Sequence, residues 1–493
     1  MKKISKLELI VFICGASVMI LELLGARIIA PYLGTSIYIW ASLIGIILGA
    51  LSLGYWLGGK LADLKPKPNY LAGIILASAV FIGILPLFKD SILEFGALMN
   101  IKLGGIFAAF FLFAIPSILL GMVSPYALKL KIKNIQTSGK TAGTLYALST
   151  LGSIFGTFLA GFWLIPYFKL EHILFGISLV LILTSIMAYS LKRAILLSAF
   201  FLVTFSGLVF LSESLNAKYL VEKDSAYNHI EIYDTRNKED RPIRILRMGS
   251  DFHSAMYLDQ SDELVFEYTK FYRLGDFFYS NIKKALMIGG GAYSVPKDFL
   301  KRHSQGEIDV VEIDPEVTKL AKTYFDLKED ERLRVFHEDG RIYLNNNQEK
   351  YDVIYNDAFS STYAIPHQLT TKEVVEKMHN ALNKNGVLIT NVISALSGEK
   401  SEFFKAEYKT LKTVFPNVLV FPVETQDQKT VQNIMIVSLK NKDFDLSAML
   451  NSISGTEFET YFNNLENHII IPSETPILTD SFAPVEYLIG KIL

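Results

Sequence analysis

The sequence has almost no cysteine. The one cysteine among its 493 residues is Cys14, which lies inside a long apolar run. A single thiol can form neither a disulfide framework nor a thiolate metal site within the chain. The seven histidines that follow residue 211 include no pair at the helical spacing of metal ligands. We therefore expect no bound metal.

Acidic residues are scarce in the first 211 residues, and basic residues are in the minority after them. The first part has 6 Asp and Glu against 16 Lys and Arg, whereas the remainder has 43 against 32. An acidic domain has a field that suits a cationic ligand and repels nucleic acid. We expect no nucleic-acid partner for the C-terminal part.

Long apolar runs dominate the first part of the chain. The whole sequence is 51% hydrophobic, which is high for a soluble enzyme. A bilayer is spanned by about 20 apolar residues in a helix. Seven segments approach that length, so we expect a multi-pass protein of the lipid bilayer, in the cell membrane. The segments are Leu9–Tyr32, Ile37–Gly59, Tyr70–Phe88, Gly104–Tyr126, Ala142–Tyr167, Leu170–Tyr189 and Ala194–Leu211.

The loop charges predict an orientation for these segments. Lysines are concentrated at the N-terminus and in alternate loops, so the positive-inside rule places the N-terminus in the cytoplasm. Seven crossings would then put the C-terminal part outside. The enzyme described below would use a donor made in the cytoplasm. Either one segment does not cross, or the C-terminal part faces out, and the sequence leaves both open.

From about Leu215 the pattern changes to alternating strands and helices. Ala226–Tyr233 and Ile243–Met248 are predicted strands of a small β-subdomain, and Asp262–Phe278 is a predicted aromatic-rich helix. The later alternation predicts a parallel sheet covered by helices. The expected domains are 1–211 for the membrane helices, 212–280 for the β-subdomain and connecting helix, and 281–493 for the α/β domain.

Three glycines follow the first strand of this α/β domain. The strand Ala285–Ile288 leads into Gly289, Gly290 and Gly291, and Glu312 follows the next apolar strand. In doubly wound sheets such glycines let the backbone approach a nucleotide, and the acid about 20 residues later accepts hydrogen bonds from ribose hydroxyls. The spacing predicts a nucleoside site with Glu312 at the ribose.

Two further carboxylates follow strand ends. Asp339 comes after the third strand and suits an adenine amino group, and Asp357 ends the fourth strand. Ligands bind at the carboxyl ends of such strands, so we expect these acids to converge. Asp357 is the one placed for chemistry. A single Asp at a strand end is also a common helix cap, and this alternative stays open.

At these residues the chain resembles a known family. The segment from Tyr227 to Ser394 is similar to spermidine synthases, the polyamine aminopropyltransferases. The matching motifs are Gly289-Gly290-Gly291, Val311-Glu312-Ile313-Asp314, Asp339-Gly340 and Tyr351-Asp352-Val353-Ile354 leading to Asp357. The whole chain resembles the membrane-fused branch, often called fused transporter–spermidine synthase. The motifs for that likeness are Gly25-Ala26-Arg27, Asp357-Ala358-Phe359, Ile365-Pro366-His367-Gln368-Leu369-Thr370 and Leu478-Thr479-Asp480.

The resemblance implies a multi-pass α-helical membrane domain followed by an α/β Rossmann-like, methyltransferase-type domain with a small N-terminal β-subdomain. It implies that Glu312 binds ribose, Asp339 adenine and Asp357 the amine nucleophile. The donor would be decarboxylated S-adenosylmethionine and the acceptor a small cationic polyamine, and a homodimer is a further expectation. The implied donor-binding residues are Gly289, Gly290, Gly291, Glu312, Asp314, Asp339 and Gly340.

The chain departs from the family at several positions. Soluble members have an acid directly after the glycines, where this chain has Ala292, and a second acid where it has Ser360. The family's His-Glu pair aligns with Glu267 and Tyr268, and the Gln of its Tyr-Gln pair with Asn228. The aromatic rings of Tyr227, Tyr268 and Tyr363 could hold a polyamine by cation–π contact, or could be core or rim residues. The expected acceptor-binding residues are Tyr227, Asn228, Glu267, Tyr268, Ser360 and Tyr363.

We expect a membrane-anchored aminopropyltransferase on these grounds. Two alternatives follow from the departures. One is a methyltransferase that uses intact S-adenosylmethionine, because the acid missing at Ala292 weakens aminopropyl specificity. The other is a transporter or sensor whose nucleoside-binding domain has lost catalysis. The acids lost at Ala292 and Ser360 favour this alternative, and the retained Asp357 opposes it.

Overall fold

The computed structural model describes residues 5–132, 134–188, 219–249, 251–358, 365–453 and 455–490. The chain divides into two compact units, Met1–His229 and Ile230–Leu493. We describe each unit by itself.

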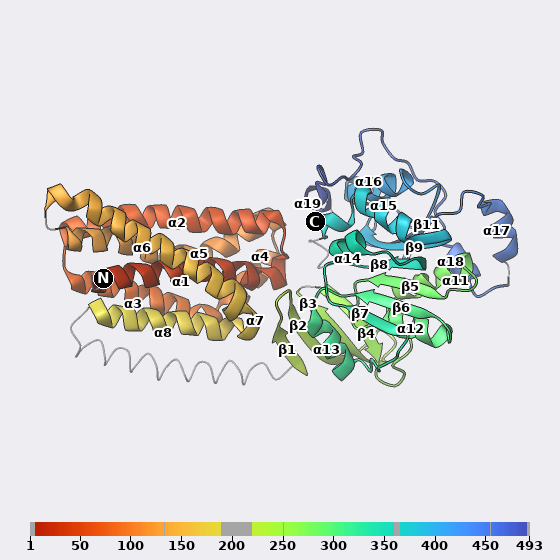
Figure 1. Cartoon of the computed structure of the whole chain (residues 1–493), viewed down its shortest axis with the longest axis horizontal. Coiled ribbons are helices and arrows are strands. Elements are labelled where there is room, and N and C mark those ends of the chain that lie inside the picture. Colours follow the sequence, from red (N-terminus) through yellow and green to blue (C-terminus); the bar gives the residue numbers. More distant parts are fainter. Residues whose placement is uncertain are drawn as a thin grey trace. The chain divides into compact units, whose positions relative to one another are not determined.

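The first unit is a set of long apolar helices, drawn from red to yellow in Figure 1. Among the described residues, six helical segments are long and apolar enough to cross a bilayer, which suggests a multi-pass membrane protein. The seventh predicted span, Ala194–Leu211, lies outside the described residues, so the side of the bilayer that the C-terminal part occupies stays a prediction. The elements are α1 (Lys6–Leu33), α2 (Ile37–Leu64), α3 (Pro68–Ile84), η1 (Leu85–Leu87), α4 (Lys89–Ala97), α5 (Ile101–Lys131), η2 (Ile135–Thr137), α6 (Ser138–Leu159), the π-helical turn η3 (Ala160–Leu164), α7 (Ile165–Tyr167) and α8 (Leu170–Ala188).

Glycines bring pairs of these helices into backbone contact. A Cβ atom added at Gly152 or Gly156 of α6 would lie 2.0 Å from the Phe12 carbonyl oxygen or 2.4 Å from that of Ala16, both on α1. At Gly54 it would lie 2.3 Å from the Ile118 carbonyl oxygen on α5. Small residues allow this close packing where lipid supplies no hydrophobic driving force between helices.

A small antiparallel sheet precedes the α/β domain. Its strands are β1 (Val221–Asp224), β2 (His229–Arg236), β3 (Pro242–Met248) and β4 (Asp251–Tyr257), in the order β1-β2-β3-β4. The predicted helix Asp262–Phe278 is shorter and broken into α10 (Glu267–Lys270), η4 (Phe271–Arg273) and α11 (Leu274–Phe278). It begins late because Leu264 is held extended by a β-bridge to Met256.

A seven-stranded mixed sheet forms the centre of the second unit. Its order is β10-β11-β9-β8-β5-β6-β7, and β5 to β9 run parallel. Strand β11 is antiparallel to both of its neighbours. This is the Rossmann-like sheet of the methyltransferase type that the sequence predicted. The strands are β5 (Lys284–Ile288), β6 (Glu307–Val311), β7 (Leu333–Phe336), β8 (Tyr351–Asn356), β9 (Leu382–Ser394), β10 (Asn417–Pro422) and β11 (Gln432–Leu439).

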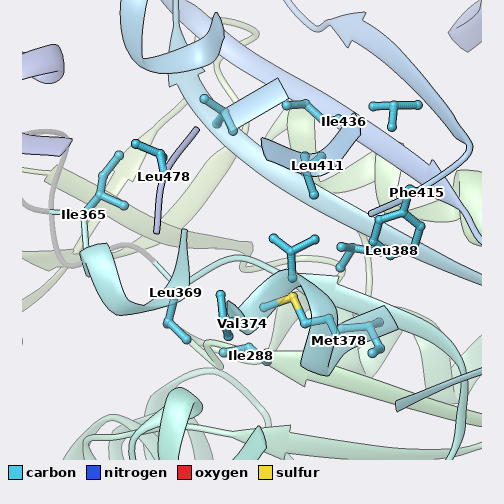
Figure 2. Close-up of a cluster of buried hydrophobic side chains, with 14 of the residues drawn as sticks. Ile288, Ile365, Leu369, Val374, Met378, Leu388, Leu411, Phe415, Ile436 and Leu478 are labelled. Carbon is cyan, nitrogen blue, oxygen red and sulfur yellow. The ribbon is translucent and has the colours of Figure 1, made fainter. Parts of the chain in front are cut away.

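Helices cover both faces of this sheet, and Figure 1 shows α15 and α16 on one side and α12 on the other. One apolar cluster joins the sheet to α14, α15 and α16, and Figure 2 shows part of it around Leu388, Leu411 and Met378. A second cluster joins the opposite face to α11, α12 and α13. The helices are α12 (Ser294–Arg302), α13 (Pro315–Tyr324), α14 (Gly340–Asn346), η5 (His367–Leu369), α15 (Lys372–Ala381), η6 (Glu399–Ser401), α16 (Glu402–Lys412), α17 (Leu446–Ile453), α18 (Glu459–Phe462) and α19 (Val485–Ile489).

Candidate active site

The glycine turn after β5 lies against the end of β8. The Asp357 N–H donates to the Ile288 carbonyl at 2.9 Å, and a Cβ atom at Gly289 would lie 2.4 Å from the Asp357 carbonyl oxygen. Gly289 also has φ +93°, which an L side chain rarely adopts. Glycine is therefore needed here for the two strand ends to meet, in addition to any approach of a ligand.

Glu312 directly follows β6 and faces the glycine turn. Its Oε2 accepts from the Gly290 N–H at 2.8 Å and the Gly291 N–H at 3.3 Å, and its Oε1 from the Asp314 N–H at 3.0 Å. Burial raises the pKa of the Glu312 carboxyl, and these N–H donors oppose the rise. A carboxylate has about four acceptor positions. Three are used here, and this leaves room for a further donor such as a hydroxyl.

Asp314 and Asp339 each begin a helix. The Asp314 Oδ1 accepts from the Glu316 N–H at 3.0 Å, as an N-cap of α13. The Asp339 Oδ1 accepts from the Arg341 N–H at 2.8 Å and the Ile342 N–H at 3.2 Å, as an N-cap of α14. The Asp339 Oδ2 has a longer contact of 3.4 Å with the Gln368 amide nitrogen, so this oxygen is the one left for a ligand.

Gly340 allows α14 to start close to the sheet. A Cβ atom at this position would lie 2.7 Å from the Cγ2 atom of Ile288, at the end of β5. The glycine motif after β7 therefore has a packing reason that requires no ligand.

Asp357 follows β8 and is surrounded by neutral hydrogen-bonding groups. Its Oδ1 accepts from the Asn391 amide nitrogen at 3.0 Å, and the Asn391 Oδ1 accepts from the Asn433 amide nitrogen at 3.0 Å. The second contact fixes the Asn391 amide so that its NH₂ group faces Asp357. This short network connects β11, β9 and the end of β8.

Two tyrosine hydroxyls also approach the Asp357 carboxyl. Burial raises its pKa to about 6, against the lowering effect of Asn391, Tyr272 and Tyr268. Burial also raises the pKa of Tyr268 and Tyr272 well above 10, and the Asp357 charge adds to the rise. The Tyr272 hydroxyl has no hydrogen bond of good geometry among the described residues, yet it lies near enough to lower the pKa of Asp357. A carboxyl with a pKa near neutrality can accept a proton during a reaction and release it afterwards.

The expected acceptor-binding residues are not all gathered at Asp357. Tyr268 lies there, but the Glu267 side chain is 65% exposed and pairs with Lys270 at 2.5 Å. Tyr227 and Asn228 lie in the turn between β1 and β2, in the first unit. Ser360 and Tyr363 lie outside the described residues. Ala292, at the position of the family's missing acid, is buried, and its N–H donates to the Ser254 Oγ at 2.9 Å.

The sequence analysis missed Tyr272, Asn391 and Asn433. Two signals could have found them. Tyr272 lies four residues after Tyr268, which places both rings on one helical face. Asn391 is an amide in the otherwise apolar stretch of β9, and a buried polar group of that kind needs a hydrogen-bond partner.

The strand order and the acids at three successive strand ends define a Rossmann-like domain of the methyltransferase type. Residues 268–447 match the family model of the spermine/spermidine synthase domain. A polyamine aminopropyltransferase of Vibrio vulnificus (strain CMCP6) is 28% identical over 280 residues, which is 54% of this chain and 90% of that protein. The chain therefore carries a domain of the spermidine synthase, or polyamine aminopropyltransferase, family, and six long apolar helices precede it.

Two further proteins resemble parts of this chain. An eEF1A lysine and N-terminal methyltransferase of Xenopus laevis is 36% identical over 116 residues, which is 22% of this chain and 16% of that protein. The crystal structure of a probable spermidine synthase from Corynebacterium glutamicum ATCC 13032 superposes with a TM-score of 0.42 and 20% identity. That superposition covers 51% of this chain and 97% of the other.

Proposed function

We propose that this protein is a membrane-bound aminopropyltransferase. It transfers the aminopropyl group of decarboxylated S-adenosylmethionine to a polyamine and releases methylthioadenosine. The observation that carries the proposal is the half-buried Asp357 carboxyl, with its pKa raised to about 6, beside the glycine turn of a spermidine synthase family domain. The acidic balance of the C-terminal part supports a cationic acceptor.

The donor nucleoside would lie along the ends of β5, β6 and β7. Glu312 would accept a ribose hydroxyl at its remaining acceptor position, and the Oδ2 atom of Asp339 would accept from the adenine amino group. The three N–H donors on Glu312 hold its carboxylate in place before the donor arrives, so little ordering is left for binding.

The reaction would be a displacement at the propyl carbon next to the sulfonium. The amine nitrogen forms a bond to that carbon, the carbon–sulfur bond breaks, and its electron pair leaves with the thioether of methylthioadenosine. The attacking amine loses one proton, which Asp357 accepts. Asn391 keeps the carboxylate oriented through its hydrogen bond, and the two tyrosine hydroxyls lower the pKa of Asp357. Positioning of the two reactants supplies much of the rate.

A methyltransferase reaction is the second candidate. The similarity to a lysine and N-terminal methyltransferase and the alanine at position 292 both favour it. The test is to incubate the purified full chain in detergent with each donor and a panel of polyamines, and to identify the products by mass spectrometry. We expect methylthioadenosine from the decarboxylated donor. S-adenosylhomocysteine from the intact donor would establish methyl transfer, and no product from either donor would favour a sensor.

A further inference from the structure

A small cavity lies between the sheet and α16. Its lining is mainly apolar and includes Ile365 and Leu369 of the cluster shown in Figure 2. It has space of about 10 Å³, enough for one water-sized molecule. Thr390, which lines it, precedes Asn391 in β9, so the two side chains point to opposite faces of the sheet. The cavity is therefore on the face away from Asp357. Its other lining residues are Asn356, Ala358, Ile365, Leu369, Thr370, Asn391, Val392, Phe403 and Glu407.

Three oxygen atoms from residues that line this cavity have no hydrogen-bond partner among the described residues. They are the Oε2 of Glu407, the Oδ1 of Asn356 and the Oγ1 of Thr390. The residues are 2%, 8% and 3% exposed, so bulk water does not satisfy these atoms. Buried acceptors without donors are costly, and such groups in a native protein call for an explanation.

The group that fits these oxygens is a donor with positive charge. An ionised carboxylate, an amide oxygen and a hydroxyl together offer many lone pairs and one hydrogen. Among the described residues, no Lys, Arg or His lines the cavity. Burial raises the pKa of the Glu407 carboxyl to about 8, which shows how little its charge is compensated by the protein. A single carboxylate also makes a poor site for magnesium or calcium, which take about six or more oxygen ligands.

We propose that this cavity binds one ammonium group, with Glu407 as its counter-ion and Asn356 and Thr390 as further hydrogen-bond acceptors. An ammonium ion has about the size of a water molecule and only donates hydrogen bonds, which matches the three open acceptors. The group has two sources, a free ammonium ion or the end of a polyamine. The second source rests on the proposed function, whereas the first does not.

The test is hydrogen–deuterium exchange on the full chain in detergent. Peptides that cover α16 and the end of β9 are compared in ammonium chloride, in 1,4-diaminobutane and in tetramethylammonium chloride at equal ionic strength. Tetramethylammonium has no N–H and is too large for the cavity. A ligand that binds only the closed state slows exchange by about tenfold at ten times its dissociation constant. We expect this saturable protection from ammonium or the diamine, and none from tetramethylammonium.

Two variants locate the effect. Glu407→Gln keeps the side-chain shape and removes the charge, so it should lose the protection, whereas Glu402→Gln on the same helix does not alter the cavity and should keep it. If Glu407→Gln does not fold, Thr390→Val removes one acceptor and should weaken the protection. Protection by ammonium alone identifies the free ion, and protection by the diamine identifies an amine end.

Equal exchange in all three salts would overturn the proposal, since a water molecule would then fill the cavity. Equal protection in the wild type and Glu407→Gln would also overturn it. The measurement needs no turnover. A protein that transfers no group can therefore still pass this test, and an active transferase can fail it.

Discussion

Two pairs of acids in the second unit differ in how their carboxyl groups are held. At the ends of β6 and β7, Glu312 accepts three backbone N–H groups and Asp339 accepts two. At the end of β8, Asp357 accepts from one side-chain amide, and on α16 the Oε2 of Glu407 accepts nothing among the described residues. The donors to the first pair come from the backbone of the fold itself, whereas the one donor to the Asp357 carboxyl is a side chain.

This difference matches a division between binding and chemistry. An acid whose carboxyl accepts several backbone N–H groups is fixed in position and suits recognition of a rigid nucleoside. An acid that is buried with few donors keeps a raised pKa, about 6 for Asp357 and about 8 for Glu407. Carboxyl groups with strongly shifted pKa values are found most often at functional sites. The comparison therefore supports the proposal that Glu312 and Asp339 recognise the ligand, whereas Asp357 and Glu407 handle a proton and a cation.

The largest effect is expected from Asp357→Asn. The change keeps the hydrogen-bonding shape and removes the proton acceptor, so the turnover with the decarboxylated donor should fall by about 10²–10⁴-fold. Steady-state release of methylthioadenosine measures it. Glu267→Gln and Asp480→Asn are the comparison variants, because a base elsewhere would most readily be one of these acids. If either of them lost the activity while Asp357→Asn kept it, Asp357 would not be the base.

Glu407→Gln should change the pH dependence of stability. The raised pKa of Glu407 means that the folded protein keeps this proton while the unfolded chain loses it above about pH 4.5. Wild-type stability should therefore fall, from this group, by about 1.4 kcal/mol per pH unit up to about pH 8, and the variant should lack that slope. Urea unfolding of the full chain without ammonium salts, followed through the α16 amides, measures the difference. Parallel pH profiles would contradict the burial of an uncompensated charge.

Tyr272→Phe should give a smaller shift in the rate profile. The Tyr272 hydroxyl lowers the pKa of Asp357, so its removal should raise that pKa and move the acidic limb of the turnover profile to higher pH. Tyr355→Phe is the matched control. Its ring packs edge-on against Tyr272 at 5.3 Å and its hydroxyl is likewise buried, but it is not among the groups that act on Asp357. An identical profile for both variants would exclude this role for Tyr272.

The smallest effect is expected from Asp480→Asn. Arg341 donates to Asp480 at 3.0 and 2.6 Å, which holds the pKa of Asp480 below 3.8, and Thr371 donates to it at 2.7 Å. The Arg341–Asp480 ion pair therefore stabilises the folded state at neutral pH, and this stabilisation is lost in acid when Asp480 is protonated. Because the Asp480 side chain is 46% exposed, the loss of unfolding free energy should stay below about 1 kcal/mol. A larger loss of unfolding free energy in urea would show that this contact stabilises the C-terminal segment around Asp480 more than an exposed ion pair can.

Regular patterns made much of the fold predictable from the sequence. Hydropathy predicted the six described helices that are long and apolar enough to cross a bilayer, and the alternation of strands and helices predicted the parallel part of the sheet. The glycine turn and Glu312 could also be identified from the sequence, because they lie about 20 residues apart in one βαβ unit. Their predicted roles in binding the nucleoside remain to be tested.

The surroundings of Asp357 were harder to predict. Asp357 is adjacent to Asn391 and Asn433 only because β8, β9 and β11 are neighbours in the sheet. The Glu407 cavity likewise combines residues from β8, β9 and α16, and no local spacing reveals it. The broken helix around Tyr272 depends on a bridge to β4. These features are set by tertiary contacts, which outweigh local propensity.

Calorimetric titration of methylthioadenosine into two variants is the most direct test of the proposal that Glu312 serves binding and Asp357 serves chemistry. Glu312→Ala removes a charged acceptor and should lose about 1.5–3 kcal/mol of binding free energy for each ligand hydrogen bond. Asp357→Asn should bind with nearly the wild-type affinity, because the proposed nucleoside site lies along the ends of β5, β6 and β7. Unchanged affinity in Glu312→Ala, or an equal loss in both variants, would contradict this account.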